Sequence, residues 1–393
     1  MPGSRPTFQL RGTCPGTSAR AGELITARGT VPTPVLMPVG SQATVKTLTP
    51  GEIRAAGMRM VLANTYHLYL RPGISVIERL GGLHKFMAWD GAILTDSGGY
   101  QVFSLAGLRR VTDDGVVFRS HIDGSEHSLT PEQAVQYQEA LGADIAMVLD
   151  ECPAADSSPE DMRRAMRRTH RWAERCLRAH QRVDQALYGI VQGGLDRELR
   201  RESAQFLVSL GLAGYGIGGL SLGEPKQVTL DMTGYTAALL PEDRPRYLMG
   251  VGSPEDIVEG VALGIDMFDS VLPTRVARNG SLFTSGGRVN IHNAAYGRME
   301  APVEPGCECY TCRTFSAAYL HHLFRARELL AYRLATIHNL AFIGSLVRGI
   351  RAAVLDGSFE SFRQRFLAAY RPTDEQTRLE QKQKWLRSRA KGE

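Results

Sequence analysis

The sequence lacks long hydrophobic runs, since no stretch approaches the roughly 18 consecutive apolar residues that a membrane-spanning helix needs. Its first residues, MPGSRPTFQLRGTC, lack the apolar core of a secretory signal. Cysteine is also scarce: the chain has six, and three of them fall within residues 307–312, which is unlike the disulfide framework of a secreted domain. These absences predict a cytoplasmic protein without a membrane segment.

The remaining composition is that of an ordinary globular protein, with 43% hydrophobic and 22% charged residues among 393. This length fits one large α/β barrel with an insertion better than one small domain. Residues 1–274 hold 27 Lys and Arg against 31 Asp and Glu, a net charge of −4, so the total of +5 leaves +9 for residues 275–393. This basic second part suggests binding of a polyanion, although a solvated basic face would look the same.

Short apolar runs that end in glycine, aspartate or asparagine recur along the chain. Runs that are apolar on both faces are typical of parallel strands buried on both sides. The runs are 35–40 (VLMPVG), 60–66 (MVLANTY), 92–99 (AILTDSGG), 145–151 (IAMVLDE), 187–194 (LYGIVQGG), 215–220 (YGIGGL), 246–252 (RYLMGVG) and 265–272 (IDMFDSVL). Eight strands with helices between them predict an α/β fold, the (β/α)8 TIM barrel. A doubly wound sheet is the alternative, but no GxGxxG follows the first run.

Four segments between these runs have the pattern of a helix start. Each offers a hydroxyl N-cap, proline at the first helical position and an acid or amide three residues after the cap. The segments are 49–52 (TPGE), 130–133 (TPEQ), 158–161 (SPED) and 253–256 (SPED). Three of the helices are expected to stop at Gly57, Gly142 and Gly264. Residues 115–130, two alternating runs around Asp123-Gly124, predict a β-hairpin inserted after the third strand.

Reactive side chains are expected at the C-terminal ends of the strands, where a barrel of this kind places its active site. Those ends carry Asn64, Asp96, Asp150, Gln192, Gly218-Gly219-Leu220, Gly250 and Asp269. Two carboxylates can perform a glycosyl transfer, one attacking the anomeric carbon while the other moves a proton. A third carboxylate with an amide nearby can bind the edge of a nucleobase. The spacing alone does not separate nucleoside chemistry from sugar hydrolysis.

The segment CECYTC places Cys307, Cys309 and Cys312 in a pattern that strongly indicates a metal site. Tetrahedral zinc needs a fourth ligand. The candidates downstream are His321, His322 and His338. The residues alone leave this choice open. A closed set of three cysteines and one histidine has no open coordination position, so the zinc would be structural.

These patterns divide the chain into four parts. Residues 1–276 form the barrel, with the hairpin insertion at about 108–130. Residues 277–345 form a zinc-binding subdomain inserted after strand eight, and residues 346–370 return as the last barrel helix. Residues 371–393 form a polar, basic tail.

A series of longer motifs between residues 6 and 370 carries a family resemblance. They are NTYHLYLRPG (64–73), LTDSGGYQVFSL (94–105), LDEC (149–152), VQGG (191–194), GGLSLGEP (218–225), MGVGSPEDI (249–257), FDSVLPTR (268–275), CECYTC (307–312) and HNL (338–340). Together they resemble the bacterial tRNA-guanine transglycosylases, also called queuine tRNA-ribosyltransferases. So many long motifs make the resemblance very specific.

The resemblance implies a zinc-containing TIM-barrel pentosyltransferase of queuosine biosynthesis. Such an enzyme exchanges the wobble guanine of tRNAs with GUN anticodons for a 7-deazaguanine, in most bacteria 7-aminomethyl-7-deazaguanine (preQ1). The reaction is a double displacement through a covalent enzyme–tRNA intermediate, without ATP or nicotinamide. The resemblance also implies a cytoplasmic homodimer with one structural zinc ion per subunit.

The motifs carry the family's site residues onto this sequence. Asp269 would be the nucleophile and Asp96 the general acid/base, while Asp150 would bind the amino and imino edge of the base. Gln192 and the Gly219 amide would lie on its carbonyl side. Further residues implied to bind the base are Tyr100 and Met249, which would sandwich the ring, the Leu220 carbonyl, Gly250 and Cys152.

The resemblance also assigns the metal and RNA contacts. Through the HNL motif, His338 would complete the zinc site of Cys307, Cys309 and Cys312. Arg275 and Arg278, which follow Asp269 closely, are expected to meet phosphates of the anticodon loop. A base in a folded loop must be turned out to reach Asp269, so these contacts also have to offset unstacking.

Small departures from the family pattern bear on the choice of base. Ser270 follows the nucleophile where cysteine is frequent, and Leu222 stands where valine is common. A larger residue at 222 argues against bulky queuine, and Cys152 favours preQ1 in the same way.

Three other functions compete with base exchange in tRNA. A non-catalytic tRNA-binding homologue is disfavoured because Asp96 and Asp269 are both present. The archaeal relative that modifies a D-loop guanine carries additional C-terminal RNA-binding domains, which the 23 residues of 371–393 are too short to form. A sugar hydrolase is disfavoured by the closed ligand set and the basic second part of the chain.

Overall fold

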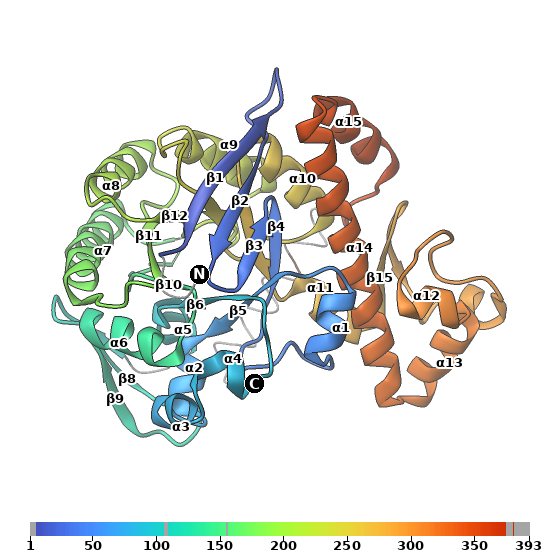
Figure 1. The fold of residues 1–393 in the computed structure, drawn as a ribbon, viewed down its shortest axis with the longest axis horizontal. Coiled ribbons are helices and arrows are strands. Elements are labelled where there is room, and N and C mark those ends of the chain that lie inside the picture. Colours follow the sequence, from blue (N-terminus) through green and yellow to red (C-terminus); the bar gives the residue numbers. More distant parts are fainter. Residues whose placement is uncertain (1–4, 106–108, 155, 375–379, 381–393) are drawn as a thin grey trace.

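Eight parallel strands form the central sheet of the computed structural model, which describes residues 5–105, 109–154, 156–374 and 380. Their order is β4-β14-β13-β12-β11-β10-β6-β5 (Figure 1). A parallel bridge between Val39 and Leu62 and a 2.6 Å hydrogen bond from the Gly40 N–H to the Leu62 carbonyl join β4 to β5, which closes the barrel. The strands are β4 (Val35–Pro38), β5 (Met60–Asn64), β6 (Ala92–Asp96), β10 (Ile145–Met147), β11 (Ala186–Val191), β12 (Gly214–Ile217), β13 (Arg246–Leu248) and β14 (Met267–Ser270). All eight predicted strands and the predicted barrel are confirmed.

Helices between the strands cover the outside of the barrel (Figure 1). They are α1 (Pro50–Ala55), α2 (Thr65–Leu70), α3 (Ile74–Arg79), α4 (Gly82–Phe86), α5 (Gly99–Leu105), α6 (Pro131–Leu141), α7 (Pro159–Ala179), α8 (Arg197–Ser209), α9 (Lys226–Ala237), α10 (Pro254–Ala262) and α11 (Leu272–Arg278). The four predicted N-caps are confirmed. They are Thr49, Thr130, Ser158 and Ser253, each accepting a hydrogen bond from the backbone N–H three residues later. Gly57, Gly142 and Gly264 have positive φ at the expected stops.

An antiparallel sheet near the N-terminus was not predicted. It consists of β1 (Thr7–Thr13), β2 (Arg20–Thr26) and β3 (Gly29–Pro32), and it covers the end of the barrel where the strands begin. Arg20 there forms a bidentate ion pair with Asp266, with Nε–Oδ1 and Nη2–Oδ2 distances of 2.9 and 2.8 Å. Both side chains are buried, and the arginine also donates to the carbonyls of Glu242 and Arg244. This pair fixes the sheet on the barrel floor.

The insertion after β6 is a three-stranded antiparallel sheet of β7 (Arg109–Val111), β8 (Val116–Arg119) and β9 (Glu126–Leu129). The predicted hairpin around Asp123-Gly124 is confirmed, because Arg119 pairs with Glu126 across that turn. The third strand, β7, pairs with β8 and was missed. Residue 108, where the insertion was expected to begin, lies outside the described residues.

The chain after α11 first protrudes from one side of the barrel and then returns to the barrel in α14 and α15 (Figure 1). It contains β15 (Ser281–Thr284), β16 (Gly287–Asn290), the 3-10 helix η1 (Ala294–Arg298), α12 (Tyr310–Thr314), α13 (Ala317–Ala326), α14 (Leu329–Leu355) and α15 (Phe359–Ala369). The division expected at residue 345 falls inside α14. The single helix expected over 346–370 is the second half of α14 followed by α15, because Gly357 breaks the helix with φ of 79°. Most of the expected tail lies outside the described residues.

Helix α14 connects the protruding part to the barrel, where it packs against α11, α10, β2 and β4. By length and composition it is the one helix among the described residues that could cross a membrane. However, 61% of its apolar window is buried inside the molecule, as is typical of the core helix of a soluble protein.

Replacing Arg20 with methionine tests the ion pair on the floor. The Arg20→Met change leaves the Asp266 carboxylate buried without its cation, so we expect the free energy of unfolding to fall by about 3–5 kcal/mol. Urea denaturation at neutral pH measures this. The matched control is Arg11→Met, whose partner Glu23 is bound at the surface, and which should cost less than about 1 kcal/mol. Equal losses in the two variants would contradict the account.

Candidate functional site

Three carboxylates from three different strands lie together at the C-terminal end of the barrel. Asp96 is the last residue of β6, Asp269 lies in β14, and Asp150 follows β10. The charge of Asp269 contributes to raising the pKa of Asp96, and the charge of Asp96 contributes to raising that of Asp150. The closed barrel therefore brings together side chains that are far apart in the sequence, as the strand pattern predicted.

Asp96 is half-buried and is held by the end of the neighbouring strand. The Thr65 N–H donates to Oδ1 at 2.9 Å, Gln101 Nε2 donates to Oδ2 at 2.7 Å, and Asn64 Nδ2 also donates to Oδ2. Burial raises the pKa of Asp96 to about 6, although these hydrogen bonds lower it and the Asp269 charge adds to the rise. A carboxyl group with such a pKa can both give and accept a proton near neutral pH.

Asp269 is half-buried and is anchored through one of its oxygens. Oδ1 accepts hydrogen bonds from the Tyr247 hydroxyl and from the Gly250 N–H, each at 2.6 Å. Burial raises the pKa of Asp269, while these two hydrogen bonds lower it. Both hydrogen bonds from described residues end on Oδ1, which orients the carboxylate and leaves Oδ2 to react.

Asp150 is buried and faces a buried amide. Its Oδ2 accepts a hydrogen bond from Gln192 Nε2 at 2.7 Å. Burial raises the pKa of Asp150 to about 6; the Gln192 hydrogen bond lowers it and the Asp96 charge raises it. Within the described part of the chain, the Gln192 Oε1 atom is buried without a hydrogen-bond partner. A buried polar atom of this kind needs an explanation, and a polar ligand bound in the site would supply one.

The loop after β12 approaches this amide closely. A Cβ at Gly219, where φ is +67°, would lie 2.5 Å from Gln192 Oε1, so only glycine fits. Further along, the buried Glu224 carboxylate accepts hydrogen bonds from the backbone N–H groups of residues 221–223, which fixes the loop. A hollow beside it is lined by Pro153, Met162, Gln192, Gly194, Leu195, Gly219, Leu222 and Glu224.

The other residues expected to bind a base follow the strand ends, and Tyr100 among them lies in α5. Tyr100 and Met249 are half-buried, Leu220 is buried, and Gly250 is exposed. Cys152 lies near Gln192 and Gly219, and burial raises the pKa of its thiol to about 12, so it is neutral.

Arg275 and Arg278 lie on α11, which directly follows β14, and both are half-buried. Arg278 Nη1 donates to the Thr274 carbonyl at 2.9 Å, so this guanidinium partly supports its own helix. Their expected role toward RNA remains a prediction.

Two residues that support the carboxylates were missed by the sequence analysis. Tyr247 lies on β13 and reaches Asp269 from the neighbouring strand, which no local pattern indicates. Gln101 lies five residues after Asp96, in the same motif, and its amide position could have suggested the contact.

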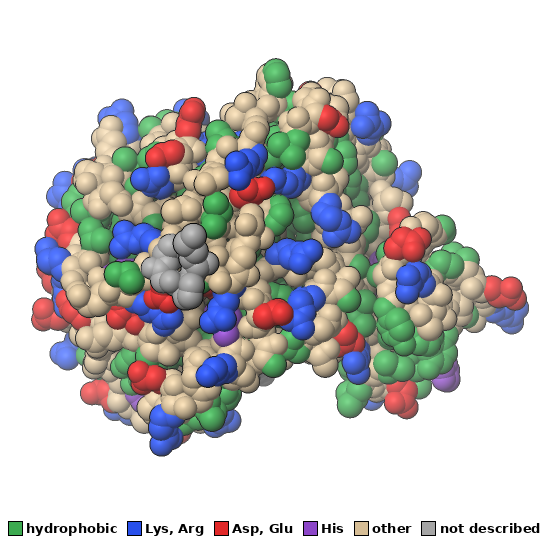
Figure 2. Space-filling model, viewed as in Figure 1, with side chains coloured by type: hydrophobic (Ala, Val, Ile, Leu, Met, Phe, Trp, Pro, Cys, Tyr) green, Lys and Arg blue, Asp and Glu red, His purple; other side chains and the backbone are tan. Residues whose placement is uncertain are grey.

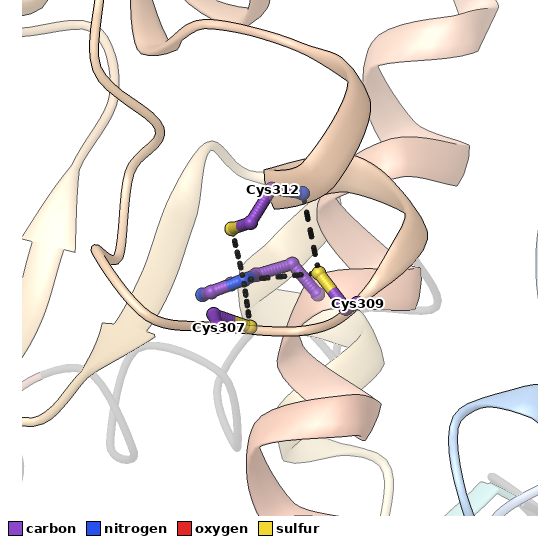
Figure 3. A group of neighbouring side chains, drawn as sticks. Cys307, Cys309 and Cys312 are labelled. Carbon is purple, nitrogen blue, oxygen red and sulfur yellow. Dashed lines mark hydrogen bonds between the residues drawn. The ribbon is translucent and has the colours of Figure 1, made fainter.

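Three cysteines and one histidine form a compact cluster in the protruding part of the chain. Their potential ligand atoms all lie within 4.8 Å of one another. Cys307 and Cys309 lie in the segment before α12, and Cys312 lies in α12; the three side chains converge (Figure 3). His338 Nδ1 is 3.8, 3.7 and 3.2 Å from the sulfurs of Cys307, Cys309 and Cys312.

This cluster fits a zinc ion. Tetrahedral zinc with usual bond lengths places sulfur and nitrogen ligands about 3.6 Å apart, close to the distances observed. His338 Nε2 lies 2.7 Å from the Phe283 carbonyl; its proton bonds to that oxygen, which leaves the Nδ1 lone pair for a metal. His321 Nδ1 lies 2.7 Å from the Ile291 carbonyl instead. The structure thus brings His338 to the cysteines, as the family resemblance implied.

Known proteins are similar to this chain over nearly its whole length. A family model described as "Queuine tRNA-ribosyltransferase" matches residues 14–372. A protein of Dehalococcoides mccartyi named "Queuine tRNA-ribosyltransferase" is 59% identical over 384 residues, which are 98% of each chain. Proteins with the same name from Pelotomaculum thermopropionicum and Moorella thermoacetica are 59% and 55% identical over 354 residues, 90% of this chain and 96% and 95% of theirs.

Replacing one cysteine tests the metal cluster. We expect the purified protein to contain about one zinc ion per chain, and Cys312→Ser to lose most of it because one thiolate of the closed set is missing. Elemental analysis of the dialysed proteins measures this. The control is Cys176→Ser, a buried cysteine on α7 outside the cluster, which should retain the metal. Equal zinc contents in both variants would show that the cluster does not hold it.

Proposed function

The chain belongs to the queuine tRNA-ribosyltransferase family of pentosyltransferases, and from this we propose that it exchanges the wobble guanine of GUN-anticodon tRNAs for preQ1. One observation carries the proposal. Two half-buried carboxylates, Asp96 and Asp269, interact at the rim of the barrel, and Asp96 also interacts with Asp150, whose carboxylate is bonded to Gln192 beside the Gly219 loop. A transglycosylase needs this combination of two reactive carboxylates and a base-binding edge.

Asp269 acts as the nucleophile. Its Oδ2 attacks the ribose anomeric carbon, the bond from that carbon to guanine breaks, and a covalent enzyme–tRNA intermediate forms. The Tyr247 hydroxyl and the Gly250 N–H, both on Oδ1, hold the carboxylate in place for the attack. The incoming base displaces Asp269 in turn, so the configuration at the anomeric carbon is retained.

Asp96 moves the protons. The raised pKa of about 6 lets it protonate the departing guanine and take a proton from the incoming base. Asn64, Thr65 and Gln101 hold its two oxygens in fixed directions.

The base lies against Asp150, whose carboxylate accepts from the amino and imino N–H groups. The Gln192 amide and the Gly219 N–H donate hydrogen bonds to the carbonyl of the base. The Leu220 carbonyl accepts from the aminomethyl group, and Tyr100 and Met249 lie on the two faces of the ring. Leu222 narrows the hollow beside Gly219, which favours the small aminomethyl substituent over queuine.

Cys307, Cys309, Cys312 and His338 would hold a structural zinc ion, because four protein ligands leave no open position. These ligands would tie the segment before α12 to the long helix α14, and α14 joins the protruding part to the barrel. The residues of this part, with Arg275 and Arg278, bind the phosphates of the anticodon loop.

The protein acts as a homodimer in the cytoplasm. Four large hydrophobic side chains are exposed on the protruding part: Tyr310, Tyr319, Leu329 and Leu330. Figure 2 shows hydrophobic side chains gathered over this region. Such a patch marks an interaction surface, and a second copy of the chain is the partner that the family resemblance implies.

The exchange reaction tests the proposed function. We expect the wild type to incorporate labelled guanine into an unmodified GUN-anticodon tRNA, and Asp269→Asn to lose at least about 10³-fold in rate because the nucleophile is gone. The control is Asp243→Asn, a surface change next to Arg244, which should keep wild-type activity. Tight tRNA binding without incorporation by the wild type would contradict the proposal and favour a non-catalytic tRNA-binding protein.

The pH dependence of base binding tests the role of Asp150. Because its folded pKa is raised to about 6, the carboxylate is lost as pH falls through that value, and with it the acceptor for the base. We expect the KM for preQ1 to rise by up to about tenfold per unit below pH 6. Steady-state kinetics between pH 5 and 8 measure it. In Asp150→Asn this dependence of KM should be absent, while kcat still varies with the titration of Asp96. A wild-type KM that is constant down to pH 5 would oppose the assignment.

A further inference from the structure

Arg200 is a fully buried arginine behind the base site; the Glu224 charge acts on it from a distance, but no carboxylate of the described residues lies within ion-pair range. It lies on α8, its residue is 0% exposed, and it forms no ion pair within the described residues. Burial lowers its pKa only to about 10, so the guanidinium stays charged at neutral pH. The buried Arg20 on the floor is, in contrast, paired with Asp266. A buried cation is costly unless something stabilises it.

Backbone carbonyls at two strand ends take the place of the missing carboxylate. Arg200 Nε donates to the Gly194 carbonyl at 2.8 Å, Nη1 to Val191 at 3.2 Å and Nη2 to Gly218 at 2.9 Å. Val191, the last residue of β11, and Gly194 lie on either side of Gln192, and Gly218 precedes Gly219 after β12. One planar guanidinium therefore fixes both loops that line the base site.

The bond to Gly218 determines where the next N–H points. In a trans peptide unit the C=O and the following N–H point in opposite directions, and the 218–219 bond is trans, since cis bonds occur only before Pro34 and Pro72 among the described residues. With the Gly218 carbonyl turned to Arg200, the Gly219 N–H faces the opposite side. The Cys152 sulfur lies on that side, where it interacts with the Gly219 backbone.

We propose that Arg200 is a positioning residue: it turns the Gly219 N–H toward the carbonyl of the bound base and strengthens it as a hydrogen-bond donor. The proposal rests on the proposed function of the site. A cation on the carbonyl of a peptide unit polarises the whole unit, so its N–H becomes a better donor in a site shielded from water.

The hydrogen bond from the Gly219 N–H stabilises the base most while guanine departs. As Asp269 Oδ2 bonds to the anomeric carbon, the carbon–nitrogen bond to guanine breaks and its electron pair remains on the base. Part of this negative charge reaches the carbonyl oxygen until a proton from Asp96 neutralises the base. A donor that is aimed at that oxygen and polarised from behind stabilises the developing charge.

Two bases that differ at this carbonyl separate positioning from a purely structural role. Guanine has the carbonyl and 2-aminopurine lacks it. Their inhibition constants are measured against incorporation of labelled preQ1 into a GUN-anticodon tRNA, for the wild type, Arg200→Met and Arg200→Lys. In Arg200→Met we expect guanine to bind roughly ten- to a hundredfold more weakly, and 2-aminopurine to change less than about threefold. Arg200→Lys keeps the charge but lacks the planar fork that spans both loops, so its guanine affinity should lie between those of the wild type and Arg200→Met. It also replaces Arg200→Met in the test if that variant does not fold.

The matched control is Arg246→Met. Arg246 is also buried, but it lies at the floor of the barrel and donates to the Leu240 carbonyl. This variant should lower the urea midpoint without changing either inhibition constant. Equal losses for guanine and 2-aminopurine in the Arg200 variants, or no loss, would overturn the inference while the proposed function stands. No incorporation by the wild type would overturn both.

Discussion

The crowding of Asp96, Asp150 and Asp269 at one end of a closed barrel is the constraint on which the rest of the site depends. Parallel strands in a closed barrel must all end at the same rim, so three carboxylates that are far apart in the sequence share one partly buried space. Burial raises the pKa of each, and neighbouring charges raise it further for Asp96 and Asp150. Each carboxylate accepts hydrogen bonds from neutral donors, which are side-chain amides, the Tyr247 hydroxyl or backbone N–H groups.

Buried charges are stabilised in different ways at the two ends of the barrel. At the floor, Asp266 is paired with Arg20, whose guanidinium is also bonded to two carbonyls. At the rim, none of the three carboxylates forms an ion pair with a described residue, and the nearby cation Arg200 bonds to carbonyls instead. A cationic side chain in an ion pair would lower the pKa of Asp96 and Asp150 and keep both carboxylates ionised. Neutral donors keep both groups near the pH at which protons can move.

Much of the fold could be predicted because its signals are local. The eight strands are apolar on both faces, and the four helix starts contain their own caps, so both were read from short segments. The sheet β1–β3 was missed because β1 is largely exposed and shows no buried pattern. The sheet is attached to the floor of the barrel by the ion pair of Arg20 and Asp266, which are 246 residues apart in the sequence. The site residues at the strand ends could be predicted, because a barrel of this kind places its active site at the C-terminal ends of its strands. Their partners did not, since Tyr247 and Arg200 act across strands and through backbone atoms, and no periodic pattern records such contacts.

In the proposed reaction, Asp269 bonds covalently to the tRNA during exchange. The direct measurement is to denature the wild-type enzyme with a GUN-anticodon tRNA before any incoming base is added, digest both components and locate the ribose attachment by mass spectrometry. We expect a ribonucleotide, without its guanine, attached to the peptide that contains Asp269. Attachment at another residue, or an exchange-competent enzyme that never carries RNA, would contradict it.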